Sequence, residues 1–222
     1  MSYPYPLVVF DLDGTLVDSA ADIAEALNRT LEDIGVARVP EATVLGWIGD
    51  GVRRLVEQAV HATGREVDLA EVMPVFMVHY RECLLRSPRL FDGVGEALAQ
   101  LRARNVPLAI CTNKPEALVP PLLQHLGIGD AFALILGGDS LPQRKPSGEP
   151  LRHIAAHFGL PVDACLMVGD SLTDYRAAEE AGMPIALVRY GYPRGLDMAT
   201  AHAVAVIDDL RELPGLAAGV PV

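Results

Sequence analysis

Residues 7–15 read Leu-Val-Val-Phe-Asp-Leu-Asp-Gly-Thr, a short apolar run that ends in two aspartates and a glycine. A continuous apolar run of this length is typical of a strand buried on both faces, as in a parallel sheet. The acidic segment begins where that strand is predicted to end. Residues two apart in extended backbone point to the same side, so Asp11 and Asp13 are predicted to share one small site.

Two neighbouring carboxylates cannot both ionise freely. One is therefore expected to stay ionised as a nucleophile, while the other is held protonated as an acid. The same residues also fit a solvated turn with two ordinary surface aspartates, and this segment alone leaves both interpretations open.

Similar apolar runs recur along the chain, and helical patterns separate most of them. These runs cover residues 107–111, 133–136, 165–168, 185–188 and 203–207. Strands that alternate with helices predict an α/β fold with a Rossmann-like parallel sheet. Active sites of such sheets lie just beyond the carboxyl ends of the strands, which is where Asp11 and Asp13 are expected.

The segment from residue 18 to about residue 90 breaks this alternation, because it shows no convincing strand and has the pattern of consecutive helices. In its first helix, Ser19 is placed to cap the N-terminus, with Asp22 in a loose capping box. Apolar stripes predict two more helices, over residues 52–60 and 69–85.

Connections within α/β units normally take about 2–6 residues outside the helix, so this long segment is predicted to be an insertion. We therefore expect residues 1–17 and 91–222 to form an α/β catalytic core. Residues 18–90 are expected to form an inserted α-helical cap domain.

Residues 111–114 read Cys-Thr-Asn-Lys and follow an apolar strand. They precede Pro115, which suits the first turn of a helix. The Thr112 hydroxyl, free backbone amides and the positive end of a helix dipole could together bind a phosphate group. A simple helix cap explains Thr112 and Asn113 equally well.

Lysine is rare in this chain: of the 18 basic residues, only Lys114 and Lys145 are lysines. A lysine offers a compact point charge where arginine offers a planar fork, so both positions are candidates for a small ammonium group. Lys145 lies in a predicted loop, and Pro146 stiffens the backbone there. Chance and an ordinary surface position are the alternatives.

Residues 168–174 read Val-Gly-Asp-Ser-Leu-Thr-Asp and place Asp170 and Asp174 four apart across a predicted strand-to-helix turn. Both carboxylates can then face one point. Hard oxygen ligands with room for water suit Mg²⁺. An N-capping acid followed by a solvated helix acid would show the same pattern.

In this order, the four segments resemble the four motifs of the haloacid dehalogenase-like superfamily of phosphohydrolases, and the resemblance spans essentially the whole chain. Residues 11–15 are similar to the first motif, Thr112 fills the second, Lys145 the third, and Asp170 with Asp174 the fourth. The resemblance implies that the insertion after the first motif is a cap that closes over the substrate.

The resemblance also implies a magnesium-dependent phosphatase. Asp11 would attack phosphorus to form an aspartyl-phosphate, while Asp13 would protonate the leaving alkoxide and later deprotonate water. Dehalogenases and phosphonate-cleaving relatives lack an aspartate at the place of Asp13, so phosphate esters are the expected substrates. The implied metal ligands are Asp11, the Asp13 backbone carbonyl and Asp170, with Asp174 in support. The implied phosphate-binding residues are Gly14, Thr112, Asn113 and Lys145.

Within the superfamily, residues 46–52, 137–146 and 190–192 resemble the bacterial phosphoglycolate phosphatases. 2-Phosphoglycolate carries a carboxylate besides its phosphate, so a second anion site is expected. Gly148 departs from those enzymes, which usually have a proline there, and this difference could loosen the loop of Lys145. The candidates for the second anion site are Gly49, Asp50, Gly51, Arg53 and Lys114.

Composition narrows the partners. A formal charge of -11 and a pI near 4.9 argue against nucleic acid, and the apolar runs fall short of the roughly 20 residues needed to span a membrane. The N-terminus has no signal-peptide pattern, so a cytoplasmic protein is expected, and a homo-oligomer is left open. Two alternatives stay open: a phosphatase or mutase for another small phosphate such as a sugar phosphate, and a non-catalytic binding domain, although every motif acid is present.

Overall fold

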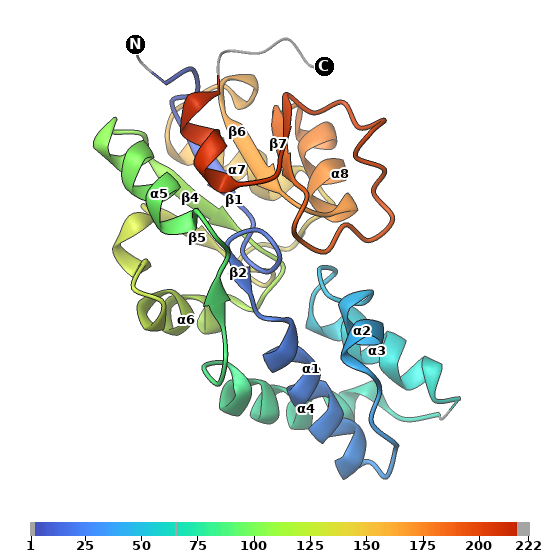
Figure 1. Cartoon of the computed structure of the whole chain (residues 1–222). Coiled ribbons are helices and arrows are strands. Elements are labelled where there is room, and N and C mark those ends of the chain that lie inside the picture. The colour runs from blue at the N-terminus through green and yellow to red at the C-terminus, as the bar shows by residue number, and fades with distance from the viewer. Residues whose placement is uncertain (1–2, 65, 217–222) are drawn as a thin grey trace.

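The structure is a computed structural model that describes residues 3–64 and 66–216 of the 222-residue chain. In the described part, six strands form one parallel sheet in the order β5-β4-β1-β6-β7-β8 (Figure 1). The central strand β1 pairs with β4 and β6, so that Val8 lies opposite Leu108 and Leu166. The predicted α/β parallel sheet is confirmed. The strands are Val8–Phe10 (β1), Leu108–Cys111 (β4), Leu134–Leu136 (β5), Leu166–Gly169 (β6), Ile185–Val188 (β7) and Ala205–Ile207 (β8).

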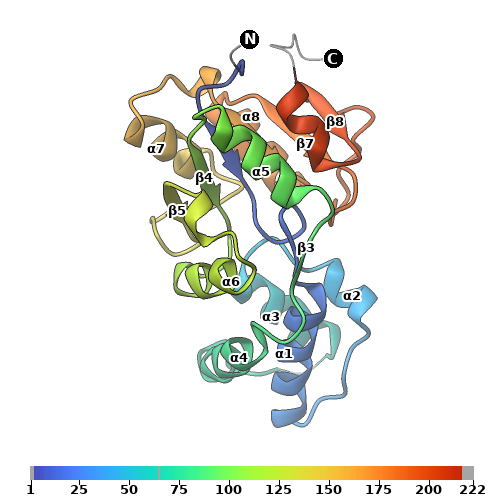
Figure 2. The ribbon, with the colours of Figure 1, turned by 60° about the vertical axis from the view of Figure 1, so that its left-hand side comes forward.

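Helices cover both faces of this sheet (Figure 2). Val8 and Phe10 belong to one buried cluster, with helices α5 and α6, whereas Leu7 and Val9 belong to another, with α7 and α8. Burial on both faces explains why the strands read as continuous apolar runs. The helices are Val94–Ala103 (α5), Val119–His125 (α6), Glu149–His157 (α7) and Leu172–Ala181 (α8).

Four helices lie together beyond one end of the sheet (Figure 1). They are Ala20–Asp33 (α1), Glu41–Leu45 (α2), Val52–Ala62 (α3) and Leu69–Cys83 (α4). The three predicted helices are present as α1, α3 and α4. The five-residue helix α2 was not predicted, because it is too short to show a helical period. Every helix in the described ranges is too short or too polar to cross a lipid bilayer.

Two short strands join these helices to the sheet. Val17–Asp18 (β2) pairs antiparallel with Arg89–Leu90 (β3). The prediction that residues 18–90 contain no strand is therefore wrong at both ends of the segment, because two-residue strands show no alternation in the sequence. The pairing brings the two connections side by side. The division of the chain into a core and a cap domain stays a prediction.

The predicted capping box at the start of α1 is also wrong. Ser19 precedes α1, but its side chain does not cap the helix. Its hydroxyl instead donates to Oδ1 of Asp13 at 2.6 Å. Asp22 accepts hydrogen bonds from the backbone nitrogen and the hydroxyl of Ser87. Both polar groups have long-range partners that compete with the local cap, and sequence spacing cannot show these partners.

Candidate active site

The carboxyl ends of three adjacent strands place the predicted motif residues at one edge of the sheet. Asp11 follows β1, Thr112 follows β4, and Asp170 follows β6. The backbone nitrogen of Asp11 donates to Val168 at 2.9 Å, so the sheet hydrogen bonding continues into the site. All three side chains are buried, as are Lys145 and Asp174. The structure therefore brings the residues of all four predicted motifs together.

Lys145 lies between two of the motif acids. Its ammonium nitrogen is 2.8 Å from Oδ1 of Asp11 and 2.6 Å from Oδ1 of Asp174. Burial would lower the pKa of Lys145, but these two carboxylates outweigh burial and raise it above its usual value. The lysine is therefore a fixed positive charge next to Asp11.

Three buried carboxylates form a compact cluster. One oxygen each of Asp11, Asp170 and Asp174 lies within 4.8 Å of the others. Burial and repulsion by Asp174 raise the pKa of Asp11 to about 7, and the same two causes raise the pKa of Asp170 well above its ordinary value. Lys145 supplies one positive charge against these three acids. The excess negative charge and the oxygen ligands fit a hard divalent cation such as Mg²⁺.

The carboxylate of Asp174 is fully engaged by the protein. Its Oδ1 accepts from Lys145, while its Oδ2 accepts from the backbone nitrogen of Ser171 at 3.1 Å and from the Ser171 hydroxyl at 2.6 Å. Ser171 and Asp174 form a capping box at the start of α8. Asp174 therefore fixes both Lys145 and the start of α8.

Asp170 is held by two segments that are distant in sequence. Its Oδ1 accepts from the Thr15 hydroxyl and its Oδ2 from the backbone nitrogen of Tyr192, both at 2.6 Å. Gly14 makes this packing feasible: its φ is +95°, and a Cβ there would lie 2.4 Å from Oδ2 of Asp170. The sequence pattern predicts no role for Thr15 or Tyr192 in holding Asp170, because both contacts join segments that are far apart in the chain.

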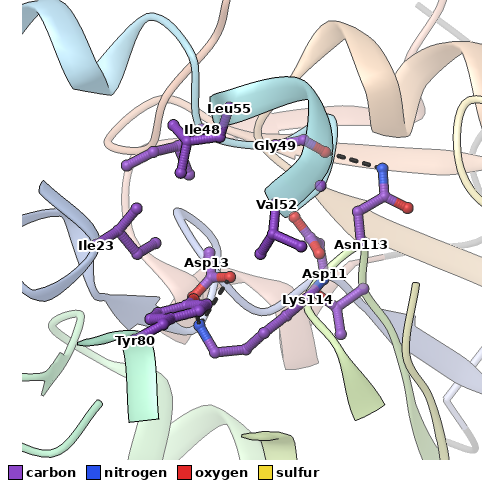
Figure 3. A pocket seen from close by; sticks show the side chains of 12 residues that line it. Asp11, Asp13, Ile23, Ile48, Gly49, Val52, Leu55, Tyr80, Asn113 and Lys114 are labelled. Atoms are coloured by element: carbon purple, nitrogen blue, oxygen red, sulfur yellow. Dashed lines mark hydrogen bonds and ion pairs between the residues drawn. The ribbon is translucent and has the colours of Figure 1, made fainter. Parts of the chain in front are cut away.

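Asp13 has its own lysine. The ammonium nitrogen of Lys114 lies 2.9 Å from Oδ1 of Asp13, and it also donates to the Tyr80 hydroxyl (Figure 3). The Lys114 side chain is fully buried. Burial would lower the pKa of Lys114, but Asp13 and Tyr80 outweigh burial and raise it. Tyr80 was not predicted, because in the sequence it looks like one more apolar position of helix α4.

A hollow lies above Asp11 and Asp13 (Figure 3). Its polar side consists of these two acids with Thr112, Asn113 and Lys114. Its other side is largely apolar and comes from residues before β3. That side consists of Ile23, Ile48, Gly49, Gly51, Val52, Leu55 and Tyr80. The arrangement encloses a small space with two acids and a buried ammonium group at its base.

The candidates for the second anion site divide into two groups. Gly49, Gly51 and Lys114 line the hollow, whereas Asp50 and Arg53 do not. The Arg53 side chain is 65% exposed on α3 and pairs with Glu57 at 3.0 Å. The structure therefore does not bring Arg53 to the site. Its position on α3 turns the side chain toward solvent, and the sequence pattern did not show which way it would face.

Asn113 organises the site through backbone carbonyls. Its amide nitrogen donates to the carbonyl of Gly49 at 2.8 Å (Figure 3). The same nitrogen donates to the carbonyl of Lys145, also at 2.8 Å. The loop of Lys145 is also tightly packed at Gly148, where a Cβ would lie 2.5 Å from the backbone nitrogen of Ala181. The glycine lets the loop pack closely on the end of α8, and the expectation that Gly148 could loosen this loop stays a prediction.

Buried carboxylates, a hydroxyl and a lysine meet at the carboxyl edge of the parallel sheet, an arrangement that suits phosphoryl chemistry. The comparison with known families agrees: the model of the haloacid dehalogenase-like hydrolases matches residues 8–188. The chain belongs to this family.

Named relatives narrow the class. The "Phosphoglycolate phosphatase, plasmid" of Cupriavidus necator is 42% identical over 218 residues, covering 97% of this chain and 94% of that protein. A phosphoglycolate phosphatase of Yersinia pseudotuberculosis is 41% identical, with 93% and 90% covered. The crystal structure of a predicted phosphoglycolate phosphatase from Haemophilus somnus superposes with a TM-score of 0.88 at 35% identity, covering 95% of this chain and 96% of that one. The chain is therefore an enzyme, a phosphoester hydrolase similar to phosphoglycolate phosphatases.

Proposed function

We propose that this enzyme hydrolyses 2-phosphoglycolate to glycolate and phosphate, with Mg²⁺ and through an aspartyl-phosphate on Asp11. The observation that carries this proposal is the pair of buried lysines: the ammonium group of Lys145 contacts Asp11 and that of Lys114 contacts Asp13. Both acids and Lys114 line one small hollow, and Lys145 lies behind Asp11. A substrate with two anionic groups suits a site with two such cations. The names of the relatives support the same substrate.

Asp11 is the proposed nucleophile. Its carboxylate attacks phosphorus, and the bond from phosphorus to the leaving oxygen breaks. Lys145 favours the ionised form of Asp11 and offsets charge on the phosphoryl oxygens, while the Thr112 hydroxyl holds one of those oxygens. Asp11, the Asp13 backbone carbonyl and Asp170 would hold Mg²⁺, with Asp174 in support. Bound Mg²⁺ supplies further neutralisation between the nucleophile and the phosphoryl group; Mn²⁺ accepts the same oxygen ligands.

Asp13 is the proposed general acid and base. It donates a proton to the leaving alkoxide and then removes one from the water that hydrolyses the aspartyl-phosphate. Ser19 and Lys114 both hydrogen bond to its carboxylate, so they fix its orientation toward the hollow. This positioning matters because proton transfer needs hydrogen-bond contact with the leaving oxygen.

Lys114 is also the proposed partner of the substrate carboxylate, together with the Tyr80 hydroxyl. The hollow is otherwise walled by apolar side chains, including Ile23, Ile48 and Leu55. A sugar would bring several hydroxyl groups against these walls, where they would lack hydrogen-bond partners. The two-carbon glycolate skeleton avoids that cost. Residues 18–90 are the proposed cap domain, which supplies this wall.

A panel of phosphate esters tests the proposal. Phosphate release is measured from 2-phosphoglycolate, ethyl phosphate and glucose 6-phosphate, with Mg²⁺, with a chelator and with the Asp11→Asn variant. Ethyl phosphate matches the skeleton but lacks the carboxylate, so its kcat/KM is expected to be much lower. If the mechanism is right, no phosphate should be released in the presence of the chelator or by the Asp11→Asn variant. Equal or higher kcat/KM for ethyl phosphate or the sugar phosphate would refute the substrate, while release by Asp11→Asn would refute the mechanism.

A further inference from the structure

Asp50 joins the loop between α2 and α3 to the part of the chain that carries the parallel sheet. Oδ1 of Asp50 accepts from the Thr173 hydroxyl at 2.8 Å, and Oδ2 accepts from Nη2 of Arg194 at 2.6 Å. Thr173 lies in α8, next to Asp174, and Arg194 lies beyond β7. The carboxylate of Asp50 therefore joins the helical segment to two separate parts of the sheet-bearing region.

Arg194 depends on this contact for its charge balance. Its side chain is only 13% exposed, and Asp50 is its one ion-pair partner within residues 3–64 and 66–216. Nε and Nη1 of Arg194 are buried and have no hydrogen-bond partner in those ranges. A buried cation left without its partner is strongly unfavourable. Arg194 also has a φ of +51°, a conformation that non-glycine residues rarely keep unless the surrounding structure imposes it.

The two glycines beside Asp50 let the loop approach closely. Gly49 has a φ of +121°, and a Cβ there would lie 3.1 Å from Nη1 of Arg194. Gly51 has a φ of +89°, and a Cβ there would lie 3.3 Å from the carbonyl oxygen of Asn113. Asn113 in turn donates to the carbonyl of Gly49. The positive φ at both positions and these close approaches favour glycine on either side of Asp50.

The position of this loop sets the wall of the hollow. Ile48 and Val52 directly flank residues 49–51, and both line the hollow above Asp11 and Asp13 (Figure 3). If the loop moved away, these apolar side chains would leave the site, and water would reach the two acids.

We propose that Asp50 and Arg194 form a positioning pair that holds loop 49–51 on the core and so closes the hollow over the reacting groups. Neither side chain lines the hollow, so both act through Ile48 and Val52 rather than on the substrate. The expected effect of the pair on turnover of 2-phosphoglycolate rests on the proposed function. Its expected effect on the position of loop 49–51 does not depend on that function.

Kinetics distinguish positioning from a general structural role. Loss of the pair lowers the fraction of molecules whose loop is closed. The apparent affinity for the substrate falls in proportion to that closed fraction. Substrate binding favours the closed loop, so saturating substrate restores most of the rate. KM for 2-phosphoglycolate should rise by about tenfold, the scale of one hydrogen bond to a charged group, while kcat falls less. A purely structural defect lowers the active fraction, so kcat falls at unchanged KM.

The experiment compares Asp50→Asn, Arg194→Met and Arg194→Lys with Arg152→Met. Arg152 is a matched control, because it forms an exposed ion pair with Glu180 between α7 and α8, at 3.2 Å. Hydrogen exchange of the amides in residues 49–56 is measured without substrate, and steady-state kinetics are measured with 2-phosphoglycolate. Melting temperatures confirm that each variant folds.

The expected result is faster exchange in residues 49–56 and a raised KM for Asp50→Asn and Arg194→Met. Arg194→Lys should be intermediate and Arg152→Met unchanged. If Asp50→Asn showed the same exchange rates in residues 49–56 and the same KM as the wild type, the proposal would be overturned. This conservative variant decides the case if Arg194→Met does not fold. If the wild type fails to hydrolyse 2-phosphoglycolate, the proposed function falls, and exchange alone still decides on the positioning pair.

Discussion

The ammonium nitrogen of Lys114 lies 2.9 Å from Oδ1 of Asp13, in a chain that has only two lysines among its 18 basic residues. The other lysine, Lys145, lies 2.8 Å from Oδ1 of Asp11. Both ammonium groups are buried, whereas arginines such as Arg53 and Arg152 pair with acids at the surface. A compact ammonium fits beside a carboxylate in a closed site where a planar guanidinium would need more room. Asp11 and Asp13 therefore each have a different buried cation beside them, and Lys145 also contacts Asp174.

Asp13→Asn should separate substrates by their leaving group. The amide keeps the shape of the side chain but cannot donate a proton to an alkoxide. We expect kcat for 2-phosphoglycolate to fall roughly 10²–10⁴-fold. The loss in kcat/KM, which covers only the steps up to release of the leaving group, should be much smaller for p-nitrophenyl phosphate, whose leaving phenolate needs no proton. Steady-state kcat/KM on both esters checks this, and equal losses in kcat/KM would show that Asp13 is not the acid.

Lys114→Met should weaken recognition of the substrate carboxylate. KM should rise more for 2-phosphoglycolate than for ethyl phosphate, by about tenfold or more if a hydrogen bond to a charged group is lost. Tyr80→Phe removes only the neighbouring hydroxyl and should show a smaller difference in the same direction. The ratio of kcat/KM values for the two esters is the measured quantity. An unchanged ratio in Lys114→Met would mean that the carboxylate binds elsewhere.

Gly14→Ala should damage the metal site. Its Cβ would lie 2.4 Å from Oδ2 of Asp170, and its φ of +95° is unfavourable for alanine. Isothermal titration with Mg²⁺ should show weaker binding, and phosphatase activity should fall. Gly95→Ala is the control, because a Cβ there meets nothing within 4 Å in helix α5. Gly95→Ala should keep activity and gain about 0.5–1 kcal/mol of stability. Normal Mg²⁺ affinity in Gly14→Ala would contradict the assigned packing.

In the metal-free protein, the contribution of Asp11 to the free energy of unfolding should fall as pH rises. The pKa of Asp11 is raised from 3.8 to about 7 in the folded chain. An acid with a raised folded pKa binds an extra proton when folded, so its contribution is full below about pH 4 and is lost as pH rises to about 7. Asp11→Asn should therefore gain stability over the wild type as pH rises, by up to roughly 1.4 kcal/mol per pH unit.

Denaturation in chelator between about pH 5 and pH 8 measures this difference. Added Mg²⁺ should raise the melting temperature of the wild type more at the higher pH, because the cation favours ionised Asp11. A stability difference that does not change with pH would show that Asp11 stays ionised without metal.

The sheet could be predicted because its four inner strands are fully buried, which is what their continuous apolar sequences predict. Residues 7–10 and 185–188 are apolar throughout, and helices cover both of their faces. Strand ends were less predictable: the expected strand at 203–207 begins at Ala205, since pairing with β7 starts only there. Ala203 is buried without joining the ladder, so its apolar side chain gave a misleading boundary.

Asp11, Thr112 and Asp170 could be predicted because each directly follows a strand, and parallel strands end at one edge. The supporting residues could not. Tyr80 occupies an ordinary apolar position of α4, and Arg194 lies in a loop with no periodic pattern. The position of Ser19 in the sequence is typical of a helix cap, but its hydroxyl donates to Asp13 instead. Their roles depend on contacts between distant segments, which local spacing does not encode.

The central claim is that Asp11 carries the phosphoryl group between substrate and water. The most direct test is rapid acid quench of the enzyme during turnover of 2-phosphoglycolate, followed by mass spectrometry of its peptides. The account predicts one phosphoryl group on the peptide that contains Asp11, and none in Asp11→Asn. A phosphoryl group on any other residue, or sustained turnover in Asp11→Asn, would contradict it.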